Sequence, residues 1–222
     1  MNIAIIGSGL TGSMASISLA KAGCIVDLYE RLSDEELLNR DRSYAITHSS
    51  RKILEKIGIW NNIESDLIPF QFLNVIDYEI NKKVRFQVND LSSTDRIYSC
   101  VGWIAEHNKI MQSILEFITN IDNINKIPTS VIPNTNNYDL IVAADGSNSS
   151  TKKKLKTPSF RFNYDQMCIT AKVLIRGANS NEAFEILNKE GPFAVLPLGR
   201  DLFQIICSQS LMMGSHNMSI SK

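Results

Sequence analysis

This chain opens with its strongest structural signal, Asn2-Ile3-Ala4-Ile5-Ile6-Gly7-Ser8-Gly9-Leu10-Thr11-Gly12. Its apolar run ends abruptly at glycine, as in a strand buried on both faces of a parallel sheet. Small and apolar residues continue to Gly23, which predicts a helix packed closely on the sheet and ended by a glycine cap. Residues 24–29 predict a second strand, with Glu30 at its end. Together these segments form a βαβ unit.

The three glycines of this stretch fit the G-x-G-x-x-G fingerprint of dinucleotide-binding proteins. Gly7 permits a tight turn, Gly9 lets a pyrophosphate approach the backbone, and Gly12 lets the helix lie close to the strand. Leu10 and Thr11 open the helix, whose free N–H groups favour phosphate. Glu30 is placed to accept hydrogen bonds from an adenosine ribose. The competing interpretation is a glycine-rich turn that binds nothing.

Composition and charge make several other classes of protein unlikely. Of 222 residues, 23 are Lys or Arg and 23 are Asp or Glu, so no basic excess indicates nucleic-acid binding. No apolar run reaches the length of a membrane span and no signal peptide is evident, so we expect a cytoplasmic protein. The four cysteines form no C-x-x-C pair and there are three histidines, which leaves little material for a metal site. We expect the cysteines to be core residues.

The rest of the chain contains helices and strands joined by polar loops. We expect a surface loop at 32–43, a polar connection at 120–137, and helices from Ser49 or Ser50 to Gly58 and at 108–119. Strands are expected at 70–76, 83–88, 138–144, 160–175, 193–198 and 202–207. The first two form an antiparallel hairpin, whereas the strand at 138–144 returns to the first sheet.

These segments predict two discontinuous domains of α/β class. Residues 1–68 and 106–158 are expected to form an incomplete Rossmann-like FAD-binding domain. Residues 69–105 and 159–207 are expected to form a mostly antiparallel sheet on the substrate side, and residues 208–222 an irregular tail. FAD is favoured over a nicotinamide cofactor at the fingerprint, because an antiparallel insertion separates the βαβ unit from the strand at 138–144.

The sequence resembles the FAD-dependent aromatic hydroxylases of the p-hydroxybenzoate hydroxylase type, and most of all their ubiquinone-biosynthesis branch. The resemblance rests on the fingerprint with Glu30-Arg31 and on segments 41–60, 106–112 and 144–149, with a further match at 191–198. It implies that NAD(P)H reduces the flavin and that one oxygen atom of O2 reaches a phenolic ring. It also implies an aromatic small-molecule substrate, and a polyprenyl substrate would imply peripheral membrane association.

The resemblance also implies further cofactor-binding residues beside the loop, namely Arg31, Arg42, Gln112, Asp145 and Gly146. Three of them have a plainer interpretation. Arg42 could be a surface arginine, Gln112 a solvated helix residue, and Asp145 a cap for the turn that follows it. His48 and His107 are interpreted as helix-boundary residues rather than acid–base catalysts, and no catalytic residue is assigned.

The family's second cofactor motif, Gly-Asp followed by a long helix, has no counterpart here, since Gly199-Arg200-Asp201 lies in an expected strand turn. We therefore expect an N-terminal portion of the family fold without independent activity, and a gene fragment, a frameshifted product or one piece of a split protein with a separate C-terminal piece would each fit. Two alternatives to the hydroxylase remain. The same fingerprint serves flavin-dependent reductases and dehydrogenases, and a non-catalytic nucleotide-binding remnant would also keep it.

Overall fold

The computed structural model describes residues 1–129, 131, 133–160 and 162–210. The chain divides into two compact units. The first comprises residues 1–41, 50–66 and 106–160, and the second comprises 42–49, 67–105 and the described part of 161–222. The units differ from the expected boundaries at residues 42–49 and 67–68, which lie in the second unit, and at residues 159–160, which lie in the first. That one unit binds FAD and the other a substrate stays a prediction.

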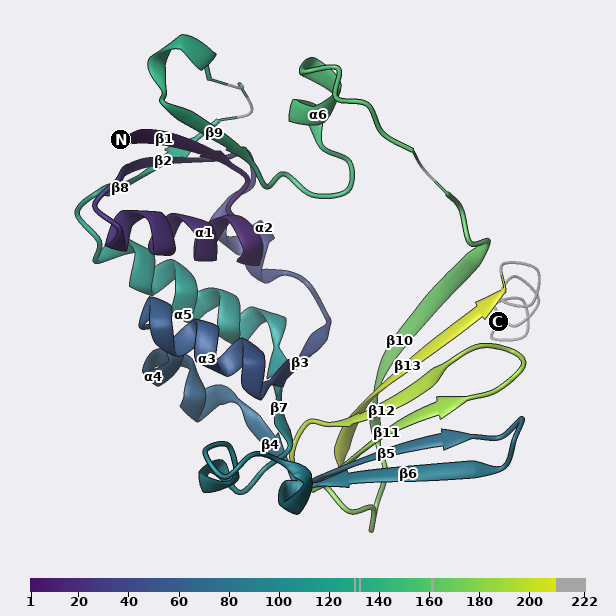
Figure 1. The fold of residues 1–222 in the computed structure, drawn as a ribbon. Helices are drawn as coiled ribbons and strands as arrows, with labels where there is room; N and C mark the ends of the chain where they lie inside the picture. The colour runs from purple at the N-terminus through teal and green to yellow at the C-terminus, as the bar shows by residue number, and fades with distance from the viewer. Residues whose placement is uncertain (130, 132, 161, 211–222) are drawn as a thin grey trace. The chain divides into compact units, whose positions relative to one another are not determined.

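A parallel four-stranded sheet organises the first unit (Figure 1), in the order β8-β2-β1-β9. Its strands are β1 (Asn2–Ile6), β2 (Ile25–Glu30), β8 (Ile124–Pro128) and β9 (Leu140–Ala143). The predicted βαβ unit is confirmed, since β1 pairs in parallel with β2. The strand predicted at 138–144 does return to this sheet, because β9 pairs in parallel with β1.

Helices of the first unit bury one face of this sheet. Helix α1 (Leu10–Lys21) packs against β1 and β2, and α5 (His107–Thr119) packs against α1. The alternating residues Ile3, Ile5, Val26 and Leu28 are at most 1% exposed, as expected of strands beneath helices. The unit also contains α4 (Trp60–Ile63), η1 (Glu64–Asp66), η4 (Thr135–Asn137) and α6 (Ser150–Lys154).

Two expected irregular segments of the first unit contain regular structure. The loop expected at 32–43 contains α2 (Asp34–Leu38), where the Ser33 hydroxyl accepts from the Glu36 N–H and the Glu36 carboxylate accepts from the Ser33 N–H. This capping box, with Leu37 buried below it, stabilises the short helix. The connection expected at 120–137 contains β8, an edge strand held by β2 despite its polar composition.

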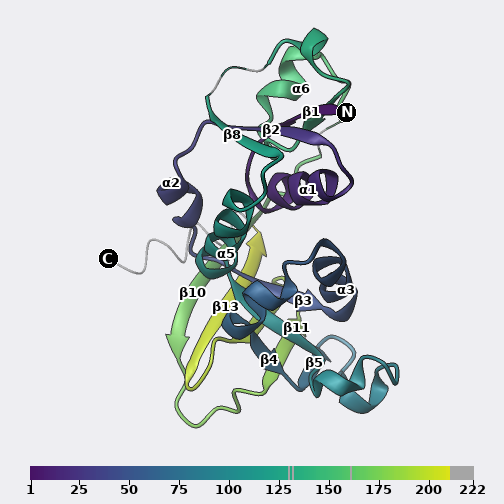
Figure 2. The ribbon, with the colours of Figure 1, turned by 90° about the vertical axis from the view of Figure 1, so that its left-hand side faces the viewer.

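A six-stranded mixed sheet forms most of the second unit, in the order β10-β13-β12-β11-β5-β6 (Figure 1), and Figure 2 shows its strands β10, β13, β11 and β5 after a 90° turn. Its strands are β5 (Phe72–Asp77), β6 (Lys82–Gln87), β10 (Gln166–Leu174), β11 (Glu182–Leu187), β12 (Phe193–Pro197) and β13 (Leu202–Ser210). The hairpin predicted at 70–88 is confirmed as β5 and β6. The strand expected from Phe160 begins only at Gln166, and β11 was not predicted.

A smaller sheet, β3-β7-β4, packs on part of the six-stranded sheet. It contains β3 (Ser43–Thr47), β4 (Ile68–Phe70) and β7 (Gly102–Glu106). The short helical turns η2 (Val88–Asp90) and η3 (Arg96–Tyr98) lie between β6 and β7 in the chain. Phe70, Ile104, Ala183 and Leu198 form the core between the two sheets. Helix α3 (His48–Ile57) spans the boundary of the two units and begins one residue before the expected caps Ser49 and Ser50.

The tail expected at 208–222 begins inside β13, which extends to Ser210, and the remainder lies outside the described residues. The turn at Gly199-Arg200-Asp201 connects β12 to β13, as predicted. No helix of the described residues has the length and hydropathy needed to cross a membrane.

Candidate dinucleotide-binding site

Two glycines of the loop between β1 and α1 are required by close backbone packing. Gly7 has a φ of +101°, and a Cβ there would lie 2.5 Å from the carbonyl oxygen of Ala144. A Cβ on Gly12 would lie 1.8 Å from the carbonyl oxygen of Gly7. The Gly7 N–H also donates to the Tyr29 carbonyl at 2.7 Å, which joins the loop to the end of β2. Any side chain at either position would therefore displace the backbone.

Gly9 differs from both, because a Cβ on Gly9 would meet no atom within 4 Å. Its φ of −62° and ψ of 175° are accessible to any residue. Neither local packing nor backbone strain therefore explains glycine here. Open space directly over the loop is what a closely approaching phosphate would need.

The open space lies at the N-terminus of α1, where Gly9 is the N-cap residue and makes no side-chain hydrogen bond. No acidic residue occupies the first turn. Leu10 and Thr11 begin the helix, so their N–H groups have no partner within it, and the helix dipole adds a partial positive charge. The residues present therefore fit the diphosphate of a dinucleotide.

Buried serines hold this loop in shape. Ser8, Ser13 and Ser16 are each 0% exposed. The Ser13 hydroxyl donates to the Ser8 carbonyl at 2.8 Å, and the Ser16 hydroxyl donates to the Ser13 carbonyl at 2.8 Å. The sequence prediction did not include these residues, although their small size next to Gly12 is a signal of close helix–sheet packing. These hydrogen bonds hold the loop against the start of α1.

Glu30 lies at the end of β2 and its carboxylate is bound to the loop. Oε2 accepts from the Ser8 N–H at 2.7 Å and from the Ser8 hydroxyl at 3.3 Å. Oε1 accepts from the N–H groups of Arg31 and Leu32 at 2.8 and 3.0 Å. Glu30 is only partly buried, and the long bond from the Ser8 hydroxyl is the weakest of the four. The carboxylate therefore stabilises the loop and also places hydrogen-bond acceptors at the edge of the loop.

Asp145 lies beside the same loop, because the Ala144 N–H donates to the Ile6 carbonyl at 2.8 Å. Its Oδ2 accepts from the N–H and hydroxyl of Thr151, each at 3.0 Å. Burial by itself raises the pKa of Asp145, but hydrogen bonds from Ser149 and Thr151 outweigh it and lower the pKa below its usual value. Asp145 thus caps α6, while its buried Oδ1 has no partner among the described residues. Gly146 follows with a φ of +82°.

The other predicted residues of the first unit are placed less distinctively. The Leu10 side chain packs against a cluster formed by Leu37, Met111 and Leu115, so only its backbone faces the loop. The Arg31 side chain is exposed. Gln112 is exposed on α5, where its amide donates to Glu116 at 3.0 Å. This bond fits the plainer interpretation of Gln112.

Arg42 belongs to the second unit, where its guanidinium lies 5.7 Å from the centre of the Tyr44 ring. The two predicted helix-boundary histidines begin α3 and α5, as expected. His48 bonds to the Cys100 carbonyl at 2.9 Å, and His107 bonds to the Leu37 carbonyl at 2.8 Å. Roles of Arg31, Arg42 and Gln112 towards a cofactor stay predictions.

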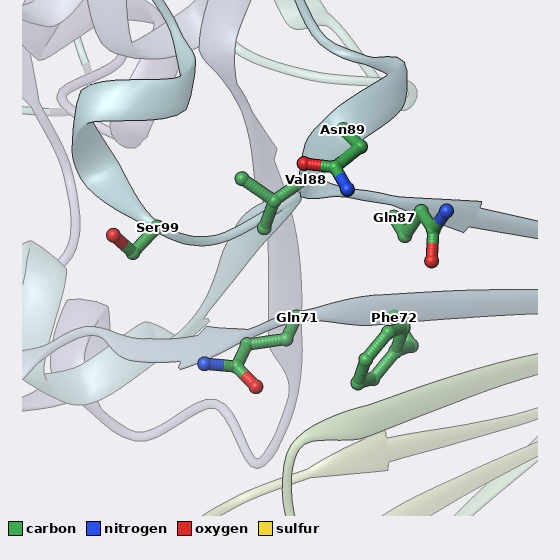
Figure 3. A pocket seen from close by; sticks show the side chains of 6 residues that line it. All are labelled: Gln71, Phe72, Gln87, Val88, Asn89 and Ser99. Atoms are coloured by element: carbon green, nitrogen blue, oxygen red, sulfur yellow. The ribbon is translucent and has the colours of Figure 1, made fainter.

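A pocket of about 310 Å³ lies in the second unit (Figure 3). It is bounded by the end of the β5–β6 hairpin and by the turn after η3, and it is lined by Gln71, Phe72, Gln87, Val88, Asn89 and Ser99. None of these side chains is a carboxylate, histidine, lysine or cysteine. The pocket therefore offers amide and hydroxyl hydrogen bonds but no acid–base group. Among the described residues, no three His, Cys, Asp or Glu side chains gather as a metal site.

Comparison with known proteins agrees with this geometry. Residues 1–100 match the family described as "FAD binding domain". The ubiquinone hydroxylase UbiM of Neisseria meningitidis is 24% identical, over 90% of this chain and 48% of the relative. The ubiquinone biosynthesis monooxygenase COQ6 of Dictyostelium discoideum is 25% identical, over 95% of this chain and 53% of the relative. The chain thus spans about half the length of these curated relatives.

A solved structure extends the likeness to the fold. Klebsiella pneumoniae HpxO, complexed with FAD and uric acid, superposes with a TM-score of 0.73 at 16% identity, over 94% of this chain and 56% of HpxO. The α/β class with a Rossmann-like sheet and a mostly antiparallel second sheet is therefore confirmed. The chain resembles the FAD-dependent aromatic hydroxylases, including their ubiquinone-biosynthesis branch, and its first 100 residues match an FAD-binding domain.

Proposed function

We propose that this chain holds FAD and acts as the N-terminal part of a monooxygenase that hydroxylates a phenolic ring with NAD(P)H and O2. The observation that carries the proposal is the open space over Gly9, framed by two glycines that backbone packing requires. A loop selected only as a turn would have no reason to exclude a side chain at Gly9. The resemblance to ubiquinone hydroxylases supports a phenolic substrate, and a polyprenyl phenol would place the reaction at a membrane surface.

Different residues would bind different parts of FAD. The N–H groups at the start of α1 would hold the diphosphate of FAD, and Glu30 would accept hydrogen bonds from the adenosine ribose while it braces Ser8. The Glu30 charge would also disfavour a 2′-phosphate at that position. When bound, the flavin supplies the redox and oxygen-transfer chemistry, whereas the protein supplies binding and orientation.

One experiment separates the three candidate functions, and its catalytic readouts are scored in the presence of the C-terminal piece that the second arm adds. Purified chain is incubated with FAD, NADH or NADPH and the apolar phenol 4-propylphenol, and flavin binding, oxygen uptake and product mass are measured. A hydroxylase binds FAD and adds one oxygen atom to the phenol. A reductase or dehydrogenase consumes NAD(P)H without inserting oxygen, and a nucleotide-binding remnant binds FAD without oxidising NAD(P)H.

A second arm adds a C-terminal piece made from the other half of a relative. We expect flavin binding by the chain alone and hydroxylation only when this piece is present, because the chain spans about half the relatives' length. Absence of both flavin binding and hydroxylation in both arms would refute the proposal.

A further inference from the structure

Two carboxylates on β11 have contrasting surroundings, although only two residues lie between them. Glu182 is fully engaged: its carboxylate accepts from Asn74 at 2.9 Å, from Arg85 at 3.1 Å and from Asn179 at 3.0 Å. Glu185 has no hydrogen bond or ion pair within the described residues, yet it is partly buried. Since successive side chains of a strand alternate, the two carboxylates lie on opposite faces of the six-stranded sheet.

The neighbours of Glu185 on its own face are apolar. The strand register places Ala194 of β12 and Val75 of β5 directly beside it, and Ile206 of β13 lies beyond Ala194. Burial in these surroundings raises the pKa of the Glu185 carboxyl. The charged residues on the same face are Asp77, Lys82 and Lys172. Asp77 is a diagonal neighbour, two residues along β5 from Val75, whereas Lys82 and Lys172 are on the edge strands.

A second unsatisfied acceptor belongs to the same face. Gln204 pairs with Leu196, which lies two residues from Ala194, so Gln204 and Glu185 point to one side of the sheet. Gln204 is 1% exposed, and its buried Oε1 has no hydrogen-bond partner among the described residues. A native structure seldom leaves such a buried group unpaired without a reason.

The Glu185 carboxylate is an unsatisfied acceptor with apolar neighbours, which defines the ligand that would complement it, whereas Gln204 lies two strands away, beyond β12. We propose that Glu185 recognises the hydroxyl group of an aromatic substrate on this face of the sheet. The inference rests on the proposed function and names the residue that selects a phenol over its ether. An apolar ring would lie against Ala194 and Ile206 beyond it, and its O–H would donate to the Glu185 carboxylate.

Alternation also separates this surface from the pocket of Figure 3. Phe72 and Gln87, which line that pocket, pair with each other and alternate with Leu73 and Phe86 of the Glu185 face. The two sheet residues that line the pocket therefore lie on the face of the sheet opposite Glu185.

The test compares a phenol with its methyl ether, which cannot donate a hydrogen bond. Affinities of 4-propylphenol and 4-propylanisole for the purified chain are measured by ligand-observed NMR, with Glu185→Leu, Glu185→Gln and the exposed control Glu190→Gln. We expect the wild-type chain to prefer the phenol by about tenfold, as a hydrogen bond to a charged acceptor predicts. Glu185→Leu should lose the preference, Glu185→Gln should keep part of it, and Glu190→Gln should keep all of it.

Two further readouts make the result specific. The phenol preference of the wild-type chain should weaken as the pH falls through the raised pKa of Glu185, and Glu185→Leu should show no such pH dependence. Thermal unfolding of each variant identifies any loss of fold, for which the nearly isosteric Glu185→Gln is the safeguard.

The outcomes distinguish this inference from the proposed function, because flavin binding is measured on the same samples. Equal affinities for phenol and ether, no phenol binding by the wild-type chain, or unchanged selectivity in Glu185→Leu would each overturn the role of Glu185, whether or not FAD binds. Phenol selectivity that depends on Glu185 in a chain that fails to bind FAD would refute the proposed function and leave this inference supported.

Discussion

The backbone N–H of Ser8 donates a 2.7 Å hydrogen bond to Oε2 of Glu30, which lies 22 residues later in the chain. One carboxylate thereby joins the glycine-rich loop to the end of β2. Its other oxygen accepts from the two N–H groups that follow β2. The residue expected to bind a ribose is therefore also part of the scaffold that shapes the phosphate loop.

Replacing Glu30 should affect stability and cofactor binding together. Glu30→Ala removes an acceptor from three backbone N–H groups, so we expect the free energy of unfolding to fall by about 1–3 kcal/mol. FAD affinity should fall by about tenfold or more, since the ribose loses a charged acceptor. Urea denaturation and flavin fluorescence titration measure the two effects. Exposed Glu35→Gln is the control, and unchanged FAD affinity in Glu30→Ala would remove Glu30 from the site.

The capping role of Asp145 predicts a pH dependence. Its pKa is lowered in the folded state, so it contributes stability above the unfolded pKa of about 3.9, and this stability is lost as the pH falls further. Asp145→Asn should therefore lower the free energy of unfolding by about 1 kcal/mol near neutral pH. The difference from the wild-type chain should shrink below about pH 4. Exposed Asp122→Asn should show neither effect; a difference for Asp145→Asn that is constant with pH would contradict the cap.

A tyrosine pair on the parallel sheet predicts the opposite pH dependence. Tyr138 donates to Asp27 at 2.5 Å, and the hydroxyls of Tyr138 and Tyr29 are 2.6 Å apart. Burial first, and then these hydrogen bonds, raise the pKa of Tyr138 well above its usual value. The neutral phenol therefore stabilises the fold below the unfolded pKa of about 10, and this contribution is lost as the pH rises beyond it.

Tyr138→Phe should consequently lower the free energy of unfolding by about 1 kcal/mol near neutral pH and weaken its alkaline dependence. Denaturation series at neutral and alkaline pH measure both quantities. The control Tyr78→Phe changes a side chain that is 64% exposed. Equal behaviour of the two variants would show that the Tyr138–Asp27 bond contributes nothing to stability.

The first thirty residues could be predicted from sequence because each local signal agreed with the next. The apolar run predicted β1, Gly23 the end of α1, and the glycine spacing the loop between them, and the structure has all three. The return of the chain at β9 was also predictable, because a buried strand must find a sheet. Local patterns were sufficient wherever burial was complete.

Edge strands and the strands of the mixed sheet were harder to predict from sequence. Residues 124–128 are polar because β8 is an edge strand, so its sequence lacks the apolar pattern that predicts a strand. Glu182 and Glu185 interrupt the apolar pattern of β11, and its parallel pairing with β5 bridges about a hundred residues of sequence. The bracing of Ser8 by Glu30 and the bond from Gln112 to Glu116 depend on side-chain directions that spacing alone does not specify.

The most direct test of the central claim is an FAD titration of the wild-type chain and Gly9→Val, followed by flavin fluorescence. A Cβ at Gly9 would meet no atom within 4 Å, so the variant should fold with at most the small loss of stability that a valine N-cap causes, and the exposed helix control Ser18→Val should fold as well. Its side chain would fill the space meant for the diphosphate, so we predict loss of FAD binding in Gly9→Val and its retention in Ser18→Val. Equal FAD affinity in the wild-type chain and a folded Gly9→Val variant would contradict the account.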